Sequence, residues 1–268
     1  MATAVPTLRG AVAAAAARLE AAGCDSPRLD AELLAAHALG VGRERIHLDA
    51  REPLEASAGR RFEELVARRA AREPVAYIVG RRAFRGIELA VDPRVLIPRP
   101  ETELLVEVAL ELPAGAWVHD LGTGSGAIAL ALAAERPDLR VTASDVSPAA
   151  LEVARSNARR LGLPVELSDG SGLPAADLVV ANLPYVADGE WDALAPEIRL
   201  YEPRIAVVAG PDGLEAIRSA VADRGAAGAA IALEHAPAQA GAVRSLLADA
   251  RTLRDLAGHE RVTVGRLP

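Results

Sequence analysis

Residues 117–126 read Trp-Val-His-Asp-Leu-Gly-Thr-Gly-Ser-Gly, a short apolar run that ends in a glycine-rich turn. The helical pattern of residues 127–136 follows, and this order is typical of the first strand-turn-helix unit of a parallel sheet. Gly122, Gly124 and Gly126 let the backbone turn sharply and approach a ligand closely, because they lack a Cβ. The stretch therefore predicts a ligand-binding turn in an α/β sheet.

The alternation of strand and helix continues to the end of the chain. Ser147-Pro148 is expected to open a helix that Gly162 closes. Strands are expected at 117–119, 140–144, 165–167, 177–181, 205–208, 230–233 and 262–264. Short apolar runs that alternate with helices predict a parallel sheet wrapped by helices.

Two different regions come before this sheet. From Leu8 to about Ala71 the apolar residues recur at helical spacing, which predicts a small helical bundle. The composition then shifts to short extended runs with glycine, 77–80 and 84–89, which predict a linker that carries a β-hairpin. The expected domains are therefore a helical domain at 1–72, a linker at 73–98 and an α/β domain at 99–268.

Composition and charge restrict the possible partners. The chain has 268 residues, of which 30 are basic and 37 acidic, so its formal charge of -7 provides no overall attraction for nucleic acid. The single Cys24 excludes an internal disulfide and a zinc site of several thiolates, so no metal is expected. We see no membrane span and no signal sequence, and we expect a cytoplasmic protein.

Asp145 comes at the end of the strand that follows the glycine turn. An acid there can accept hydrogen bonds from both hydroxyls of a ribose, which predicts a nucleoside-bearing cofactor. Gly122, Gly124 and Ala127 also satisfy the weak dinucleotide pattern, so a nicotinamide cofactor stays open. Asp120 favours S-adenosylmethionine, because a carboxylate there attracts its cationic amino-acid end and would repel a pyrophosphate.

Asn182-Leu183-Pro184-Tyr185 follows the apolar run 177–181. Asn182 offers a side-chain carbonyl, Leu183 a backbone carbonyl and Tyr185 a flat face, a set that suits a planar NH₂ group conjugated to a carbonyl or a ring. Such a nitrogen is a weak nucleophile, and positioning supplies much of its activation. Asn182 and Tyr185 are therefore the predicted catalytic residues, and residues 182–185 the predicted substrate-binding loop.

This loop resembles the Asn-Pro-Pro-Tyr motif of amino methyltransferases, and the chain resembles the release factor glutamine methyltransferases over nearly its whole length. The matching segments are residues 28–34, 73–80, 95–103, 201–204, 210–214, 234–239 and 255–261. The resemblance implies a Rossmann-like class I methyltransferase domain, dependent on S-adenosylmethionine (SAM), with a mostly parallel seven-stranded sheet. A small helical-bundle domain and a β-hairpin linker would precede it.

The resemblance also implies an activity and its residues. The methyl group of S-adenosyl-L-methionine would pass to the side-chain amide nitrogen of the glutamine in the Gly-Gly-Gln motif of peptide chain release factors, leaving S-adenosyl-L-homocysteine. The helical domain would help to dock the release factor, with no membrane or direct nucleic-acid contact. The cofactor-binding residues would be Asp120, Gly122, Thr123, Gly124, Ser125, Gly126, Asp145, Asp169, Gly170 and Asn182.

Two residues depart from the family pattern. Leu183 replaces the first proline of the motif, which frees φ and makes the loop less restricted. Gly170 stands where the family often carries an aromatic residue beside the adenine. Three alternatives remain open: a glutamine methyltransferase that acts on a ribosomal protein, a nucleic-acid exocyclic-amine methyltransferase and a non-catalytic cofactor-binding module.

Overall fold

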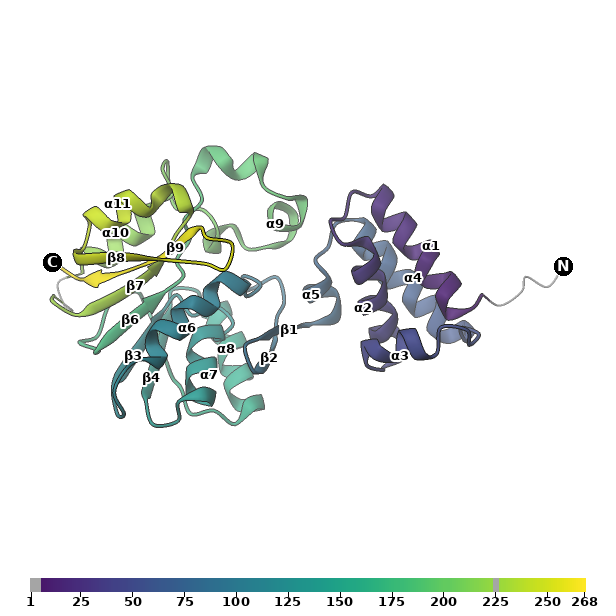
Figure 1. Ribbon diagram of the computed structural model, residues 1–268, viewed down its shortest axis with the longest axis horizontal. Helices are drawn as coiled ribbons and strands as arrows, with labels where there is room; N and C mark the ends of the chain where they lie inside the picture. The colour runs from purple at the N-terminus through teal and green to yellow at the C-terminus, as the bar shows by residue number, and fades with distance from the viewer. Residues whose placement is uncertain (1–5, 224–226) are drawn as a thin grey trace. The chain divides into compact units, whose positions relative to one another are not determined.

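The computed structural model describes residues 6–223 and 227–268, and the chain divides into two compact units (Figure 1). The first unit extends to Gly80 and also includes Pro196–Tyr201. The second comprises Arg81–Ala195 and Glu202–Pro268. The division at Gly80 lies between the boundaries that the sequence predicts after residues 72 and 98.

The first unit is helical, as the apolar spacing predicts. Its core contains the fully buried side chains of Leu19, Leu34 and Phe62. Gly40 ends the second helix in a left-handed conformation at φ 67°, which glycine adopts at little cost. The helices are α1 (Leu8–Ala21), α2 (Pro27–Leu39), α3 (Arg43–Leu48), α4 (Ala56–Ala70), α5 (Val75–Val79) and α9 (Pro196–Tyr201).

The prediction of an extended run at 77–80 is wrong, because these residues belong to the short helix α5 and its cap. Pro74 precedes the helix, and Gly80 ends it at φ 74°. Tyr77 and Ile78 are buried, and Ile78 packs into the helical core. The burial of both side chains, with Ile78 in this core, therefore outweighs the β propensity of a Tyr-Ile-Val run.

The second unit begins with the predicted β-hairpin, which is confirmed. Strands β1 (Arg81–Phe84) and β2 (Ile87–Ala90) pair antiparallel across a two-residue turn. Arg85 in this turn has φ 49°, a left-handed conformation that a tight hairpin turn requires. The hairpin is followed by the helix α6 (Glu103–Leu110) and the main sheet.

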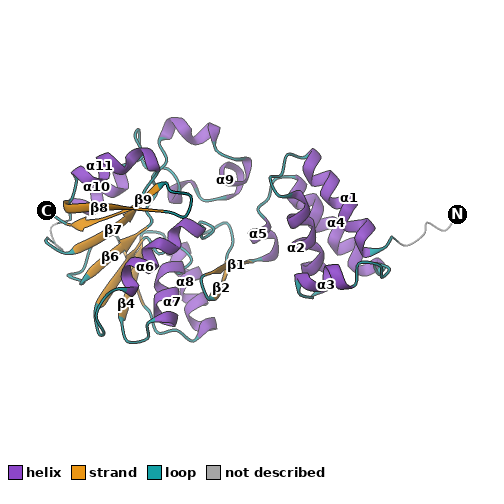
Figure 2. Cartoon of the chain, in the orientation of Figure 1, coloured by secondary structure: helices purple, strands orange, loops and turns teal. Residues whose placement is uncertain are grey.

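The main sheet has seven strands, mostly parallel, in the order β5-β4-β3-β6-β7-β9-β8. Figure 2 shows its strands in orange between the helices. Only the pairings of β9 with β7 and with β8 are antiparallel. The strands are β3 (Trp117–Leu121), β4 (Arg140–Asp145), β5 (Glu166–Asp169), β6 (Leu178–Ala181), β7 (Ala230–Glu234), β8 (Ala248–Arg254) and β9 (Glu260–Arg266). This architecture confirms the predicted α/β fold.

Helices cover both faces of the sheet (Figure 1). On one face lie α6, α7 (Ala127–Glu135) and α8 (Pro148–Leu161), and on the other α10 (Glu215–Val221) and α11 (Ala240–Ser245). Ser147 caps α8 by accepting from the Ala150 N–H, as its sequence predicts. Across residues 6–223 and 227–268, every helix falls short of the length and apolar character that a membrane span needs.

One predicted strand is wrong and one observed strand was not predicted. Residues 205–208 form part of a 3₁₀ turn (Arg204–Ala206) and a single bridge from Val208 to Val186. The 3₁₀ turn begins directly after Pro203, and Ile205 is 65% exposed. The seventh strand is instead β8, whose Asp and Arg residues hide the strand pattern because it forms an exposed edge of the sheet.

The strand register brings the ends of three parallel strands to one level. Leu121 of β3 pairs with Ser144 of β4 and with Ala181 of β6. The next residues along each strand are therefore neighbours at the carboxyl edge of the sheet, where ligands bind in such folds. Gly122, Asp145 and Asn182 all lie at this edge.

Candidate active site

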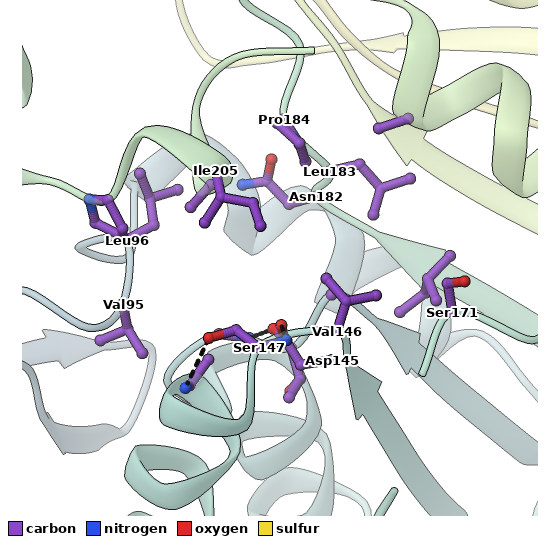
Figure 3. Close-up of a pocket in the computed structure, with 18 of the residues that line it drawn as sticks. Val95, Leu96, Asp145, Val146, Ser147, Ser171, Asn182, Leu183, Pro184 and Ile205 are labelled. Carbon is purple, nitrogen blue, oxygen red and sulfur yellow. Dashed lines mark hydrogen bonds between the residues drawn. The ribbon is translucent and has the colours of Figure 1, made fainter. Parts of the chain in front are cut away.

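A cavity of about 500 Å³ lies at this edge of the sheet, a volume that suits a small-molecule cofactor. Figure 3 shows Asp145 and Ser147 on one side of the cavity, with Asn182, Leu183 and Pro184 facing them from the other. The cavity therefore brings together the two features that the sequence singles out, the glycine turn with its acid and the Asn182 loop.

The glycine turn has the sharp geometry that its sequence predicts. The N–H groups of Gly122 and Thr123 both donate to the carbonyl oxygen of Ser144, at 2.8 and 3.0 Å. Gly122 has φ 73° and Gly124 φ 56°, both unfavourable for other residues. A Cβ on Gly124 would meet no atom of the described residues within 4 Å, so glycine keeps this part of the cavity open.

Asp145 presents a nearly buried carboxylate on the cavity wall. Its Oδ2 accepts from the Gly124 N–H at 2.9 Å, and its Oδ1 accepts from the Ser147 N–H at 2.8 Å. These bonds fix the carboxylate, yet each oxygen keeps a further lone pair. Asp145 can therefore still accept hydrogen bonds from a pair of hydroxyls on a ligand.

Asp120 lies beneath the turn and is not among the residues that line the cavity. Its Oδ2 accepts from the Thr123 hydroxyl at 2.6 Å and from the Ala129 N–H at 3.2 Å, which ties the turn to α7. Its Oδ1 has no hydrogen-bond partner among the described residues. Complete burial raises the pKa of Asp120 to about 7, and the charge of Asp145 adds to this. Its predicted contact with a cofactor ammonium stays a prediction.

Some of the remaining predicted residues line the cavity, and others lie behind the residues that line it. Gly126 is a packing position, because a Cβ there would lie 2.8 Å from Leu130 Cδ1. Tyr185 and Asp169 also lie off the wall. The predicted residues that line the cavity are Gly122, Thr123, Gly124, Ser125, Asp145, Gly170, Asn182, Leu183 and Pro184.

The predicted substrate-binding loop, residues 182–185, is held at both ends. Asn182 donates from Nδ2 to the Thr102 hydroxyl at 2.9 Å. Gln239 donates from Nε2 to the carbonyl oxygen of Tyr185 at 2.8 Å. Gly213 packs so closely on this carbonyl that a Cβ would lie 2.1 Å from its oxygen. These contacts hold the Asn182 side chain and the backbone at Tyr185, and none of them uses the side-chain oxygen of Asn182.

Two buried ionisable groups lie behind the loop. The Tyr185 hydroxyl is 3.5 Å from Glu234 Oε1, the long limit of a hydrogen bond. Burial, followed by the charge of Glu234, raises the pKa of Tyr185 to about 12. Burial also raises the pKa of Glu234 to about 7, although the Thr102 side chain opposes this shift. In the sequence, Glu234 appears only within segment 234–239, which resembles the family.

Asn157, which supports the glycine turn, was not predicted from the sequence. Its side chain is fully buried on α8. Oδ1 accepts from the Ala90 N–H at 2.8 Å, while Nδ2 donates to the carbonyl oxygens of Ala90 and Ser125 at 3.0 and 2.9 Å. The available signal was that Asn157 falls at helical spacing on the face of α8 that Ala150, Val153 and Ala154 make apolar, and buried polar groups are normally satisfied.

Comparison with known proteins agrees with this arrangement. Residues 10–80 match the model of the PrmC N-terminal domain, and residues 100–198 match the methyltransferase small domain. The release factor glutamine methyltransferase of Burkholderia pseudomallei is 46% identical and aligns over 98% of this chain and 99% of its own length. That of Cereibacter sphaeroides is 47% identical over 96% and 98% of the two chains.

A solved structure supports the fold alone. The catalytic domain of hMettl16, determined in complex with the MAT2A 3'UTR hairpin 6, superposes with a TM-score of 0.54. The match covers 76% of this chain and 82% of that one, at 15% sequence identity.

The strand order, the glycine turn and the acid at the end of β4 define a class I SAM-dependent methyltransferase fold. Within this class, the identity of 46% and 47% over nearly the full length of both relatives decides the family. The chain belongs to the release factor glutamine methyltransferase family.

Proposed function

We propose that this protein transfers a methyl group from S-adenosyl-L-methionine to the side-chain amide nitrogen of the glutamine in the Gly-Gly-Gln motif of peptide chain release factors. One observation carries the proposal. Asn182 lines the same cavity as Asp145, and its Nδ2 is engaged by Thr102, which leaves Oδ1 to accept from a substrate amide. The names of the relatives support the choice of substrate.

The residues of the cavity fit the cofactor. Asp145 would accept from its ribose hydroxyls, and the open space at Gly124 would admit its bulk. A Cβ on Gly170 would likewise meet no described atom within 4 Å, so no side chain of residue 170 narrows the adenine end. When bound, the cofactor supplies a sulfonium methyl group: the amide nitrogen gains it, the carbon–sulfur electrons stay on sulfur, and one amide proton leaves to solvent.

The protein contributes mainly by orientation. Asn182 Oδ1 and the backbone carbonyl of Leu183 would accept the two hydrogens of the substrate NH₂ group, and Tyr185 would pack beside the amide. Two acceptors fix the plane of the amide and stabilise the positive charge that develops on its nitrogen. Fixed orientation supplies much of the rate for a weak nucleophile, so the site requires no strong base.

The release factor is the proposed partner, with the helical unit as part of its docking surface. Since release factors act in translation, the cytoplasm is the proposed location. The acidic net charge of -7 supports a protein substrate over the nucleic-acid alternative.

The proposal is tested by incubating the protein with radiolabelled S-adenosyl-L-methionine and an unmodified release factor. A second release factor carries Gln→Ala in the Gly-Gly-Gln tip. We expect label on the first and none on the second. Label on both would place the methyl group elsewhere, whereas label on neither, with transfer to a ribosomal protein or an RNA offered in parallel, would establish one of the alternatives.

A further inference from the structure

The Gln239 side chain holds the end of the substrate-binding loop. Its Nε2 donates to the carbonyl oxygen of Tyr185 at 2.8 Å and to that of Asp212 at 3.2 Å. Its Oε1 accepts from the Ala236 N–H at 3.1 Å. This donor fixes which end of the amide is the oxygen, so both hydrogens of the NH₂ end are left for the two carbonyls. One side chain therefore connects the loop to the turns at Asp212 and Ala236.

Gly213 encloses the Tyr185 carbonyl from another direction. A Cβ on Gly213 would lie 2.1 Å from the carbonyl oxygen and 2.7 Å from Gln239 Nε2, so only glycine fits this position. The next N–H along the chain, that of Val186, donates to the carbonyl oxygen of Val207 at 3.0 Å. The peptide group between Tyr185 and Val186 is therefore held through both its oxygen and its N–H.

Leu183 lies between two residues that are more restricted. Asn182 donates to the Thr102 hydroxyl at 2.9 Å, and the ring of Pro184 fixes its own φ. Leu183 has no ring, so its backbone depends on what holds the loop on either side and on the packing of its side chain against the apolar core. The backbone carbonyl that the proposed mechanism uses belongs to this residue.

We infer that Gln239 is a positioning residue, which directs the Leu183 carbonyl toward the substrate amide by holding the loop two residues further on. The inference rests on the proposed function. Only Pro184 and Tyr185 separate the Leu183 carbonyl from the peptide group that Gln239 holds, and the proline ring removes one of the torsions between them. Without Gln239, the loop could rotate here, and the Leu183 carbonyl would lose the direction that the substrate NH₂ group requires.

The turn that carries Gln239 does not need this side chain to close. It is the 3₁₀ turn η5 (Pro237–Gln239), and the Gln239 backbone N–H donates to the Ala236 carbonyl oxygen at 2.9 Å. The Gln239 side chain is half-buried. Its amide can therefore be changed while the backbone of the turn is kept.

The test compares Gln239→Glu with the parent at saturating cofactor and saturating release factor. Glu has the shape of Gln and keeps an oxygen for the Ala236 N–H, but its second oxygen cannot donate to the carbonyls of Tyr185 and Asp212. We expect kcat to fall about 10-fold, while calorimetry shows unchanged affinity for S-adenosyl-L-methionine. Gln239→Ala, which adds no charge, should show the same loss.

Hydrogen exchange gives a readout that does not depend on activity. In both Gln239 variants, the amides of Leu183, Tyr185 and Val186 should exchange faster than in the parent, because the loop opens more readily. Parental kcat together with parental exchange in both variants would overturn the inference.

A second substitution tests whether Gln239 acts through the backbone of Leu183. Leu183→Pro fixes φ at this residue, so it should raise the kcat of Gln239→Ala by a larger factor than it raises that of the parent. Leu183→Ala in the same background does not fix φ and should give no recovery. An equal gain from Leu183→Pro in both backgrounds would overturn the inference.

Leu267→Ala is the matched control for a general loss of stability. Leu267 is buried, and it follows Arg266, which pairs with Ala230 at the start of β7, so it lies at the edge of the sheet opposite the cavity. This variant should be less stable, yet keep parental kcat and parental exchange in the loop. A parent that methylates no release factor would contradict the proposed function, whereas faster loop exchange in the Gln239 variants would still show that Gln239 holds the loop.

Discussion

Leu183 is the residue at which this chain departs from its family motif, and the structure shows what its side chain does. A Cβ on Gly122 would lie 3.0 Å from Leu183 Cδ2, so the leucine side chain packs on the cofactor turn. Leu183 also packs against the apolar cluster that contains Leu121 and Leu233. The side chain therefore contributes contacts, while proline would contribute a fixed φ.

We predict that Leu183→Pro leaves turnover equal to or higher than that of the parent. Proline keeps the backbone carbonyl that the proposed mechanism uses and lowers the freedom of the loop. Initial rates with a release factor substrate measure this. Leu183→Ala is the matched control, since it removes the side chain without fixing φ. A large loss in the proline variant alone would show that the loop follows a path proline cannot adopt.

At the scale of single elements, the sequence predicted those whose signals are local. The capped helix α8 begins and ends where Ser147 and Gly162 indicate. The short helix α5 was missed because its conformation depends on burial in the helical core, whose residues lie far from α5 in sequence. The strand β8 was missed because it is an exposed edge strand, in which the apolar pattern is weak.

In the candidate site, too, the sequence predicted the local features and missed the contacts between distant residues. The glycine turn, Asp145 and the Asn182 loop were found because each follows a strand directly. Thr102 lies 80 residues from Asn182 in sequence, and Asn157 lies 67 residues from Ala90. Only the fold brings these pairs together, so no spacing rule could have revealed their hydrogen bonds.

At the scale of the whole molecule, the chain enters the helical unit a second time through α9. Glu197 on α9 accepts from Arg69 at 2.7 Å and from Arg72 at 2.6 Å, and Arg69 also donates to Asp30. Burial would raise the pKa of Glu197, but the hydrogen bonds from Arg72 and Arg69 outweigh it and lower the pKa below 4.5. The helix α9, which follows the Asn182 loop in sequence, is therefore held in the helical unit by ion pairs of Glu197 with Arg69 and Arg72.

We predict that Glu197→Gln lowers the free energy of unfolding of the helical unit by about 2 kcal/mol at pH 7, because Arg69 and Arg72 lose a charged hydrogen-bond partner while Arg69 keeps Asp30. A carboxylate with a lowered folded pKa stabilises above its unfolded pKa, and this stabilisation disappears as the pH falls through the folded pKa. The difference between parent and variant should therefore shrink below pH 4.5.

Denaturant unfolding of both proteins, followed at neutral and at acidic pH, measures this difference. Glu20→Gln, at an exposed position of α1, is the control and should change little at either pH. A Glu197→Gln variant as stable as that control would show that α9 is not held by these ion pairs.

We propose that the Asn182 amide orients the substrate, while Asp145 and the glycine turn hold most of the cofactor. The direct test is single-turnover methyl transfer by Asn182→Ala, with calorimetric titration of S-adenosyl-L-methionine into the same preparation and Asp145→Asn in parallel. We predict a loss of transfer of about 100-fold or more for Asn182→Ala with unchanged cofactor affinity, and weakened affinity for Asp145→Asn. Transfer at the parental rate by Asn182→Ala would show that the Asn182 amide does not orient the substrate.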